Sequence, residues 1–244
     1  MSEETGEEPP REAAEEPWFG LVRALVHDLR TPIATASGYL ELIELDAPAL
    51  TPAHAEYLER AAIAVREISS LTTTLMEVAR LESGLRVLRT AEIAAERILS
   101  RVVARRRAIE RPSIEVRTAE AGGLRLRCDS ELVDRAVEAL LDLALARSPS
   151  CQKVELTLRP AGEGRARYSV RDLGTPIDDE RLAQLFSHHN SSAVGASAAR
   201  LALVYCRLVA SVHGGSAGAA RPADGGMEFW LEIPRAHEPR SAPD

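Results

Sequence analysis

Cysteines are few, and long apolar runs and a signal peptide are missing, in this sequence of 244 residues. Its three cysteines, Cys128, Cys151 and Cys206, lie far apart and form no CxxC pair, so the sequence predicts neither a disulfide framework nor a zinc site. No apolar run approaches the roughly 18 residues that a membrane-spanning helix needs, and the N-terminus is acidic where a signal peptide would be basic. We therefore expect a cytoplasmic protein with no membrane contact and no bound metal.

An excess of basic charge is also lacking. The formal net charge is −7, and residues 1–17 carry most of it because they are rich in Glu. Since this segment contains Glu and Pro but little apolar surface to bury, we expect an acidic disordered tail. The arginines between residues 101 and 111 form a local basic cluster, which we interpret as a solvated helix face, with an acidic partner as the alternative. Nucleic acid is therefore not an expected partner.

A long helix is expected directly after the tail. Apolar residues between Trp18 and Ile43 recur at steps of three and four, which is typical of an amphipathic helix of about 28 residues. Pro32 lies inside this helix, where it removes one backbone hydrogen bond and should kink the helix just after His27.

A second helix is expected to follow Thr51 and Pro52, which suit an N-cap and a first helical turn. Its apolar residues between positions 57 and 78 repeat every seven residues, as in a coiled coil, and Gly84 ends it. A lone antiparallel hairpin over residues 18–86 would leave apolar seams uncovered. We therefore expect a homodimer that closes a four-helix bundle.

The rest of the sequence indicates an α+β domain. We expect helices over residues 91–109, 132–146 and 201–212, and strands over residues 114–117, 124–128, 154–158, 167–170 and 228–233. The predicted fold class is therefore α+β, with the helical hairpin followed by a two-layer α/β sandwich over residues 91–235. Residues 236–244 read as a flexible tail.

The segment from Val26 to Pro32 carries the most chemistry. Helical spacing places His27 and Thr31 on one face, with Asp28 adjacent. A neutral imidazole nitrogen is able to attack phosphorus, and a carboxylate beside it holds the other ring proton and fixes the tautomer. A Thr hydroxyl one turn later is suited to position a water for attack on a phosphoryl group held by a partner. The three candidate catalytic residues are His27, Asp28 and Thr31, against the alternative of an ordinary surface histidine.

This part of the chain resembles the sensor histidine kinases of two-component signalling. Residues 27–32 are similar to their phosphoacceptor box, residues 38–42 to its usual continuation, and residues 79–84 to the end of their second dimerisation helix. The α/β part, from about residue 91 to 235, resembles their catalytic ATP-binding domain. The resemblance implies a dimerisation and phosphotransfer domain over residues 18–86, with His27 as phosphoacceptor and a receiver-domain response regulator as partner.

The nucleotide site departs from the family pattern. The resemblance places the magnesium-holding Asn of the family at Leu143 and a nearby Lys at Ala146, and leucine offers no oxygen to a hard divalent cation. The next family box keeps Asp172, which would accept a hydrogen bond from the adenine amino group, and keeps Gly174, whereas its second glycine is Pro176. Asp172 and Gly174 are therefore the candidate cofactor-binding residues of a site that is degenerate for ATP and Mg²⁺.

The last family box is a glycine-rich phosphate loop, and its three glycines align with Ala198, Arg200 and Ala202. Side chains there should obstruct the approach of backbone N–H groups to phosphates, although an arginine is able to pair with phosphate. Gly195 is the only glycine in the preceding loop. The adjacent His188 and His189 are expected on a loop surface, because neighbouring residues seldom share a metal ion.

Together these observations favour a cytoplasmic, dimeric phosphorelay protein. His27 would exchange phosphoryl groups with the Asp of a receiver domain, or the site would dephosphorylate that receiver, and ATP-dependent autophosphorylation would be impaired. Two alternatives stay open: an active ATP-dependent histidine kinase with an unusual nucleotide pocket, and a dimeric scaffold without catalysis. The sequence also leads us to expect no sensory domain before the hairpin.

Overall fold

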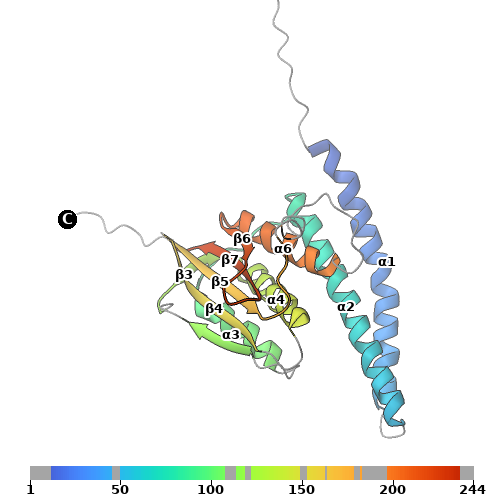
Figure 1. The fold of residues 1–244 in the computed structure, drawn as a ribbon. Coiled ribbons are helices and arrows are strands. Elements are labelled where there is room, and N and C mark those ends of the chain that lie inside the picture. Colours follow the sequence, from blue (N-terminus) through green and yellow to red (C-terminus); the bar gives the residue numbers. More distant parts are fainter. Residues whose placement is uncertain are drawn as a thin grey trace, which may run out of the picture. The chain divides into compact units, whose positions relative to one another are not determined.

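The computed structural model describes residues 12–45, 50–107, 114–118, 122–148, 153–162, 164–178, 182 and 197–236. The chain divides into two compact units, residues 1–86 and 87–244 (Figure 1). No helix in these described ranges combines the length and the apolar character that crossing a membrane requires.

The first unit is a hairpin of two long helices, α1 (Glu12–Leu45) and α2 (Pro52–Glu82). The Thr51 hydroxyl caps α2 by accepting a hydrogen bond from the His54 N–H at 3.3 Å, as its sequence predicts. Helix α1 is continuous from Glu12 to Leu45 and includes Pro32. It begins at Glu12, so the prediction of a disordered tail over residues 1–17 is wrong for residues 12–17, where alanine and glutamate favour helix.

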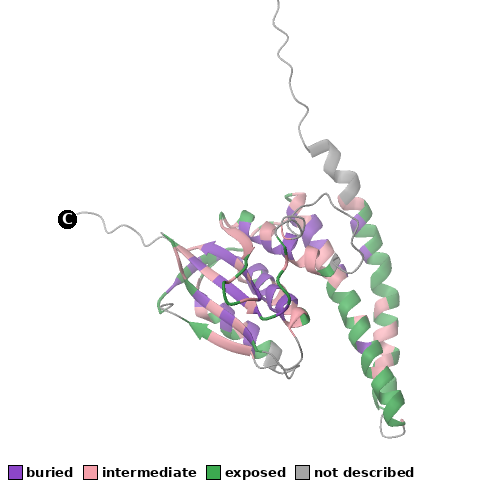
Figure 2. Cartoon of the chain, viewed as in Figure 1, coloured by how far each residue is buried: buried purple, intermediate pink, exposed green. Residues whose placement is uncertain are grey.

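A small apolar core joins the two helices. It consists of Val22 and Val26 from α1 and Met76 and Ala79 from α2, with partly buried side chains packed around it. Many other apolar side chains of the hairpin stay exposed, and Figure 2 shows green over much of both helices. The large exposed residues are Leu21, Leu25, Leu29, Tyr39, Leu42, Ile43, Leu45, Tyr57, Ile63 and Ile68. The single hairpin therefore buries only part of its apolar surface.

The second unit is built on a five-stranded mixed sheet with the strand order β2-β4-β5-β7-β6. These strands are β2 (Ile114–Thr118), β4 (Val154–Ala161), β5 (Arg165–Asp172), β6 (Ser216–Ala220) and β7 (Met227–Pro234). The pair β2 and β4 is parallel, and the other pairs of this sheet are antiparallel. A separate antiparallel pair consists of β1 (Ala91–Ala94) and β3 (Arg125–Cys128).

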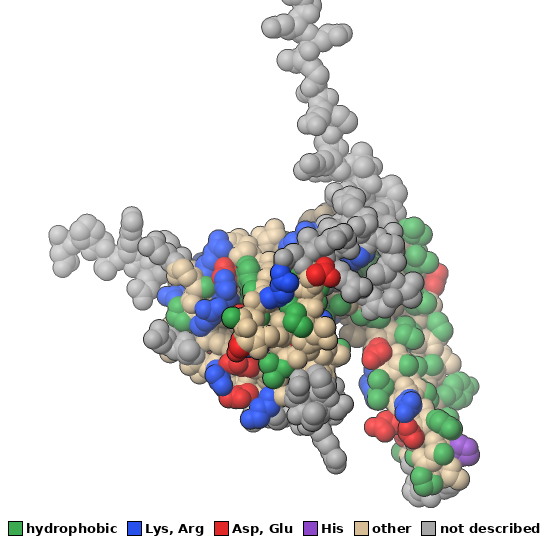
Figure 3. Space-filling view, in the orientation of Figure 1, with side chains coloured by type: hydrophobic (Ala, Val, Ile, Leu, Met, Phe, Trp, Pro, Cys, Tyr) green, Lys and Arg blue, Asp and Glu red, His purple; other side chains and the backbone are tan. Residues whose placement is uncertain are grey.

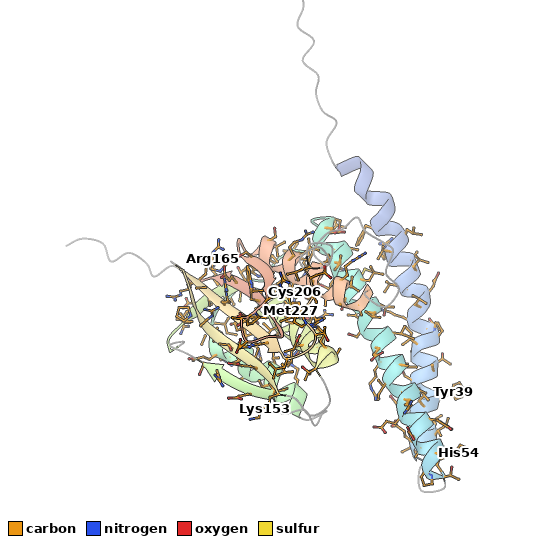
Figure 4. All side chains as sticks on the ribbon, in the orientation of Figure 1. Tyr39, His54, Lys153, Arg165, Cys206 and Met227 are labelled. Atoms are coloured by element: carbon orange, nitrogen blue, oxygen red, sulfur yellow. The ribbon has the colours of Figure 1, made fainter. Side chains whose placement is uncertain are left out.

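Three helices, α3 (Ala95–Arg107), α4 (Ser130–Arg147) and α6 (Ser197–Val212), cover one face of this sheet. Alternate side chains of the central strands point to that face, and Leu156, Tyr168 and Phe229 are fully buried there. Cys206 of α6 and Met227 of β7 lie inside the same domain (Figure 4). The two layers are the predicted α/β sandwich.

Two strands were not predicted. Residues 91–94 form β1, where helical spacing led us to expect a helix over residues 91–109, and residues 216–220 form β6. Strand β6 is Ser-Ala-Gly-Ala-Ala, and neither alanine nor glycine favours a strand. Gly218 is nevertheless needed there, because a Cβ would lie 2.4 Å from the Trp230 ring. Packing against β7 rather than strand propensity forms this edge of the sheet.

Charged residues of this domain pair with one another. Arg101 and Arg105 of α3 both bind the buried Asp134 carboxylate of α4 at 2.8 Å, and Arg105 also binds Glu138 at 2.7 Å. Burial raises the pKa of Asp134, and the two guanidinium groups oppose that shift. These two arginines therefore join α3 to α4 while their side chains stay 38% and 50% exposed, so the predicted solvated basic face also has a structural role.

The buried cysteines are packing residues. Cys128 and Cys206 are fully buried free thiols, and burial raises the pKa of Cys128 to about 12. A thiol with so high a pKa is not a nucleophile at neutral pH. Cys151, His188, His189 and Gly195 lie outside the described residues, as does most of the predicted C-terminal tail.

Candidate functional site

His27 lies in the first half of α1, and its side chain is 82% exposed. The ring Nδ1 lies 3.5 Å from Asp28 Oδ1, and the Asp28 side chain is 81% exposed. The structure therefore places the carboxylate beside one ring nitrogen, as the sequence predicts. The hairpin contributes no cover over this pair, so any reaction here needs a partner that excludes water.

Thr31 lies one helical turn after His27 and is exposed. Its carbonyl oxygen accepts a hydrogen bond from the Thr35 hydroxyl at 2.9 Å, which is an ordinary helix contact. Because residues four apart share one face of a helix, the Thr31 side chain lies on the His27 face. The three predicted catalytic residues are thus together on one exposed surface of α1.

Asp172 and Gly174 lie in the second unit, at the end of β5 and just after it. Asp172 is fully buried. Its Oδ1 accepts the Gly174 N–H at 2.8 Å, and its Oδ2 accepts Nε–H of Arg147 at 2.8 Å. The carboxylate is therefore held on both oxygens by groups of the chain itself.

Arg147 is the partner of Asp172 that sequence reasoning missed. It is the last residue of α4, a position where a basic side chain is common because it complements the helix dipole. A second guanidinium nitrogen donates to the Thr175 carbonyl at 2.6 Å. The residue that could have indicated such a partner is Asp172 itself, since a buried carboxylate needs a cation or a hydrogen-bond donor beside it.

Gly174 packs against the same helix end. A Cβ at this position would lie 2.4 Å from the Arg147 carbonyl oxygen, and one at Gly226 would lie 1.9 Å from the Asp172 carbonyl oxygen. Both distances are far below ordinary contact, so both glycines are needed for close backbone approach. Gly174 therefore has a structural role that is independent of any nucleotide.

The described residues at the positions that the resemblance gives to the magnesium ligand and the nearby lysine supply neither an oxygen ligand nor a cation. Leu143, at the position that the resemblance gives to the magnesium ligand, is only 8% exposed and has no oxygen, and Ala146 carries no charge. The Asp172 carboxylate is already bound to a guanidinium group. Within the described ranges, no three His, Cys, Asp or Glu side chains are close enough together to hold a metal ion.

The first turn and a half of α6 contains Ala198, Arg200 and Ala202, in place of the glycines that the resemblance expects. Residues 198–202 are helical, and only the N–H groups beyond the first four residues of α6 have acceptors within the helix. The residues directly before this helix lie outside the described part of the chain.

Comparisons with known proteins identify both units. The His Kinase A (phospho-acceptor) domain matches residues 20–84, and the family described as histidine kinase-, DNA gyrase B-, and HSP90-like ATPase matches residues 128–237. The two models together cover more than two thirds of the chain.

Relatives include the sensor-like histidine kinase SenX3 of Mycobacterium tuberculosis, which is 27% identical over 215 residues, covering 85% of this chain and 52% of SenX3. Sensor protein KdpD of Escherichia coli is 25% identical over 222 residues, covering 90% of this chain and 24% of KdpD. The chain thus spans about half the length of one relative and about a quarter of the other.

The solved structure of full-length ShkA in complex with AMPPNP has the same fold, with a TM-score of 0.67 and 24% identity, and the match covers 90% of this chain and 46% of ShkA. The helical hairpin, the α/β sandwich and the two family models agree. The chain therefore contains the core of a two-component histidine kinase, a phospho-acceptor domain followed by an ATPase-like domain.

Proposed function

We propose that this protein exchanges phosphoryl groups between His27 and the Asp of a receiver-domain response regulator, and that it makes little phosphohistidine from ATP. The observation that carries the proposal is the exposed His27 ring with a carboxylate 3.5 Å from Nδ1. A macromolecular phosphoryl donor can reach this ring, whereas Leu143 offers no oxygen at the position that the resemblance gives to the magnesium ligand.

The transfer follows from the geometry of the ring. Asp28 beside Nδ1 favours the tautomer with its proton on that nitrogen, so Nε2 carries the lone pair. Nε2 attacks the phosphorus of the receiver acyl phosphate, the N–P bond forms, and the P–O bond to the Asp carboxylate breaks. The carboxylate leaves with the electron pair, and the histidine keeps its Nδ1 proton. The reverse reaction uses the same groups, so no ATP is needed.

Dephosphorylation of the receiver uses the same surface. The Thr31 hydroxyl is able to hold a water one turn away from His27, and that water attacks the phosphorus of the bound receiver. Inorganic phosphate and the free Asp carboxylate are the products. His27 is then a neighbour of the reacting water and is not phosphorylated in this branch.

Several features support weak use of ATP. Leu143 removes an oxygen ligand of the metal, and the helical Ala198 and Ala202 replace loop glycines. Each lost contact of this kind weakens binding by about 1 kcal/mol or more. An active kinase is the second candidate, because residues 128–237 match the ATPase-like family. A non-catalytic scaffold is the remaining alternative if no transfer occurs.

We also propose that the protein acts as a homodimer through the hairpin. Among the described side chains of α1 and α2, ten large apolar ones are exposed, and Figure 3 shows hydrophobic side chains over the visible face of this unit. Tyr39 projects outward from α1 (Figure 4) and is 65% exposed. A second copy of the same hairpin covers such a face in a four-helix bundle.

The test uses the full chain, radiolabelled Mg-ATP, and labelled phospho-receivers encoded in the same genome. We expect little label from ATP and rapid label exchange with one receiver. His27→Ala should abolish all label on the protein, whereas His54→Ala, which alters an exposed histidine of the same hairpin, should change nothing.

Thr31→Ala should keep label acceptance and slow phosphate release from the receiver, because its hydroxyl is not the attacking group. Strong labelling of the wild type by ATP would favour the active kinase. Label that persists in His27→Ala, or no exchange with any receiver, would refute phosphotransfer through His27.

A further inference from the structure

The guanidinium group of Arg147 is held on three sides. Nε donates to Asp172 Oδ2 at 2.8 Å, a terminal nitrogen donates to the Thr175 carbonyl at 2.6 Å, and the group lies 5.7 Å from the centre of the Phe229 ring. The Arg147 side chain is 20% exposed and that of Asp172 is fully buried. Arg147 is thus a mostly buried cation that fills the space in front of the Asp172 carboxylate.

We propose that the Arg147 side chain occupies the base-recognition end of the nucleotide site, which is the region in front of the Asp172 carboxylate, and thereby excludes adenine. This inference rests on the proposed function, since Asp172 is the group that would accept a hydrogen bond from the adenine amino group. An amino group of adenine is neutral. If it displaced Arg147, it would leave a mostly buried guanidinium without its carboxylate, which costs more than a neutral hydrogen bond restores.

The backbone around the pair is built for this contact. Gly174 lets the end of α4 approach so closely that a Cβ there would lie 2.4 Å from the Arg147 carbonyl oxygen. Gly226 lets its own segment approach the Asp172 carbonyl in the same way. The position of Arg147 relative to Asp172 therefore follows from close backbone packing as well as from the side-chain contact.

A neutral side chain at position 147 should reopen the base-recognition end. Arg147→Met keeps an unbranched side chain over Phe229 and frees the Asp172 carboxylate. Arg147→Gln keeps a neutral donor, which adenine can replace without leaving a buried charge. Adenosine is the probe, because it lacks phosphates and therefore does not depend on Leu143 or on the alanines of α6.

The experiment measures adenosine binding to the full chain by calorimetry and by the shift in melting temperature. We expect the wild type to bind at least tenfold more weakly than Arg147→Met and Arg147→Gln, which corresponds to about 1.4 kcal/mol. The gain should disappear in Arg147→Met combined with Asp172→Ala. Arg159→Met is the matched control, because Arg159 pairs with Glu228 at 3.6 Å and is 46% exposed; it should gain nothing.

Folded position-147 variants that bind adenosine no better than the wild type would overturn the proposal. A second measurement covers variants that fail to fold. In the wild type, the Nε–H proton of Arg147 should give a slowly exchanging nuclear magnetic resonance signal that Asp172→Asn accelerates at least tenfold. A fast-exchanging signal in the wild type would also overturn the proposal. Neither readout uses phosphoryl transfer, so failure here is distinct from failure of the proposed function.

Discussion

A charge at Leu25 should dissociate the proposed dimer and leave the hairpin folded. Leu25 is 52% exposed in the single chain, whereas its neighbour Val26 is fully buried in the core between α1 and α2. Leu25→Glu therefore leaves the core between α1 and α2 intact. Val26→Glu is the contrasting variant, because it places a carboxylate inside the small core and should unfold the hairpin itself.

The size of the effect follows from the exposed area. Full burial of a Leu side chain is worth roughly 1.5 to 3 kcal/mol, so covering the exposed half of Leu25 contributes about 1 kcal/mol. Two-fold symmetry doubles each loss in a homodimer. Lost burial alone should then weaken the dimer by about 2 kcal/mol, roughly thirtyfold in the dissociation constant. Desolvation of the two carboxylates adds to this loss.

The assay is sedimentation equilibrium of the full chain at micromolar concentration, with circular dichroism as the check on helix content. We expect a dimer for the wild type and for Arg23→Glu, a charge change at an exposed polar position of α1. Leu25→Glu should be largely monomeric with unchanged helix content. A monomeric wild type, or a Leu25→Glu dimer as tight as the wild type, would refute the argument from the exposed seam.

Two further predictions concern the α/β domain. Burial alone would raise the pKa of Glu232, but hydrogen bonds, chiefly from Arg167, bring that pKa below its ordinary value. The ionised Glu232 therefore stabilises the folded state at pH values above its unfolded-state pKa, and this contribution is lost as pH falls through the lowered folded-state pKa. Glu232→Gln should therefore cost about 1 to 2 kcal/mol at neutral pH and less in acid in urea titrations; a difference independent of pH would contradict this. Gly174→Ala should lower the free energy of unfolding by about 1 to 3 kcal/mol without any nucleotide, because its Cβ would lie 2.4 Å from the Arg147 carbonyl oxygen. Gly122→Ala, with open space around position 122, should leave the free energy of unfolding unchanged in the same titrations.

Periodicity in the sequence was sufficient to predict the hairpin, because helices α1 and α2 repeat their apolar residues over many turns. It failed at β1 and β6, which are only four and five residues long and carry little strand propensity. These two strands form because a neighbouring strand supplies hydrogen-bond partners along the edge. That contribution comes from tertiary structure and leaves no pattern within the segment.

The sequence was sufficient to predict the residues of the candidate site, but not the pairing of Asp172 with Arg147. His27, Asp28 and Thr31 lie within one helix, so helical spacing alone places them on one surface. Arg147 and Asp172 are 25 positions apart and belong to different elements. Spacing along the sequence contains no information on such a contact, and only the packing of α4 on the sheet brings the two side chains together.

The contact between Arg147 and Asp172 changes what the presence of Asp172 and Gly174 implies about ATP binding. Asp172 is satisfied by Arg147 and by the Gly174 N–H, and Gly174 is required by the approach of the α4 backbone. Both residues therefore have a structural reason to be present without ATP, so their retention does not discriminate an active kinase from a phosphotransfer protein. Leu143 bears on the use of ATP, since a buried leucine provides no metal ligand. His27 bears on the scaffold alternative, since no packing requirement explains an exposed imidazole beside a carboxylate.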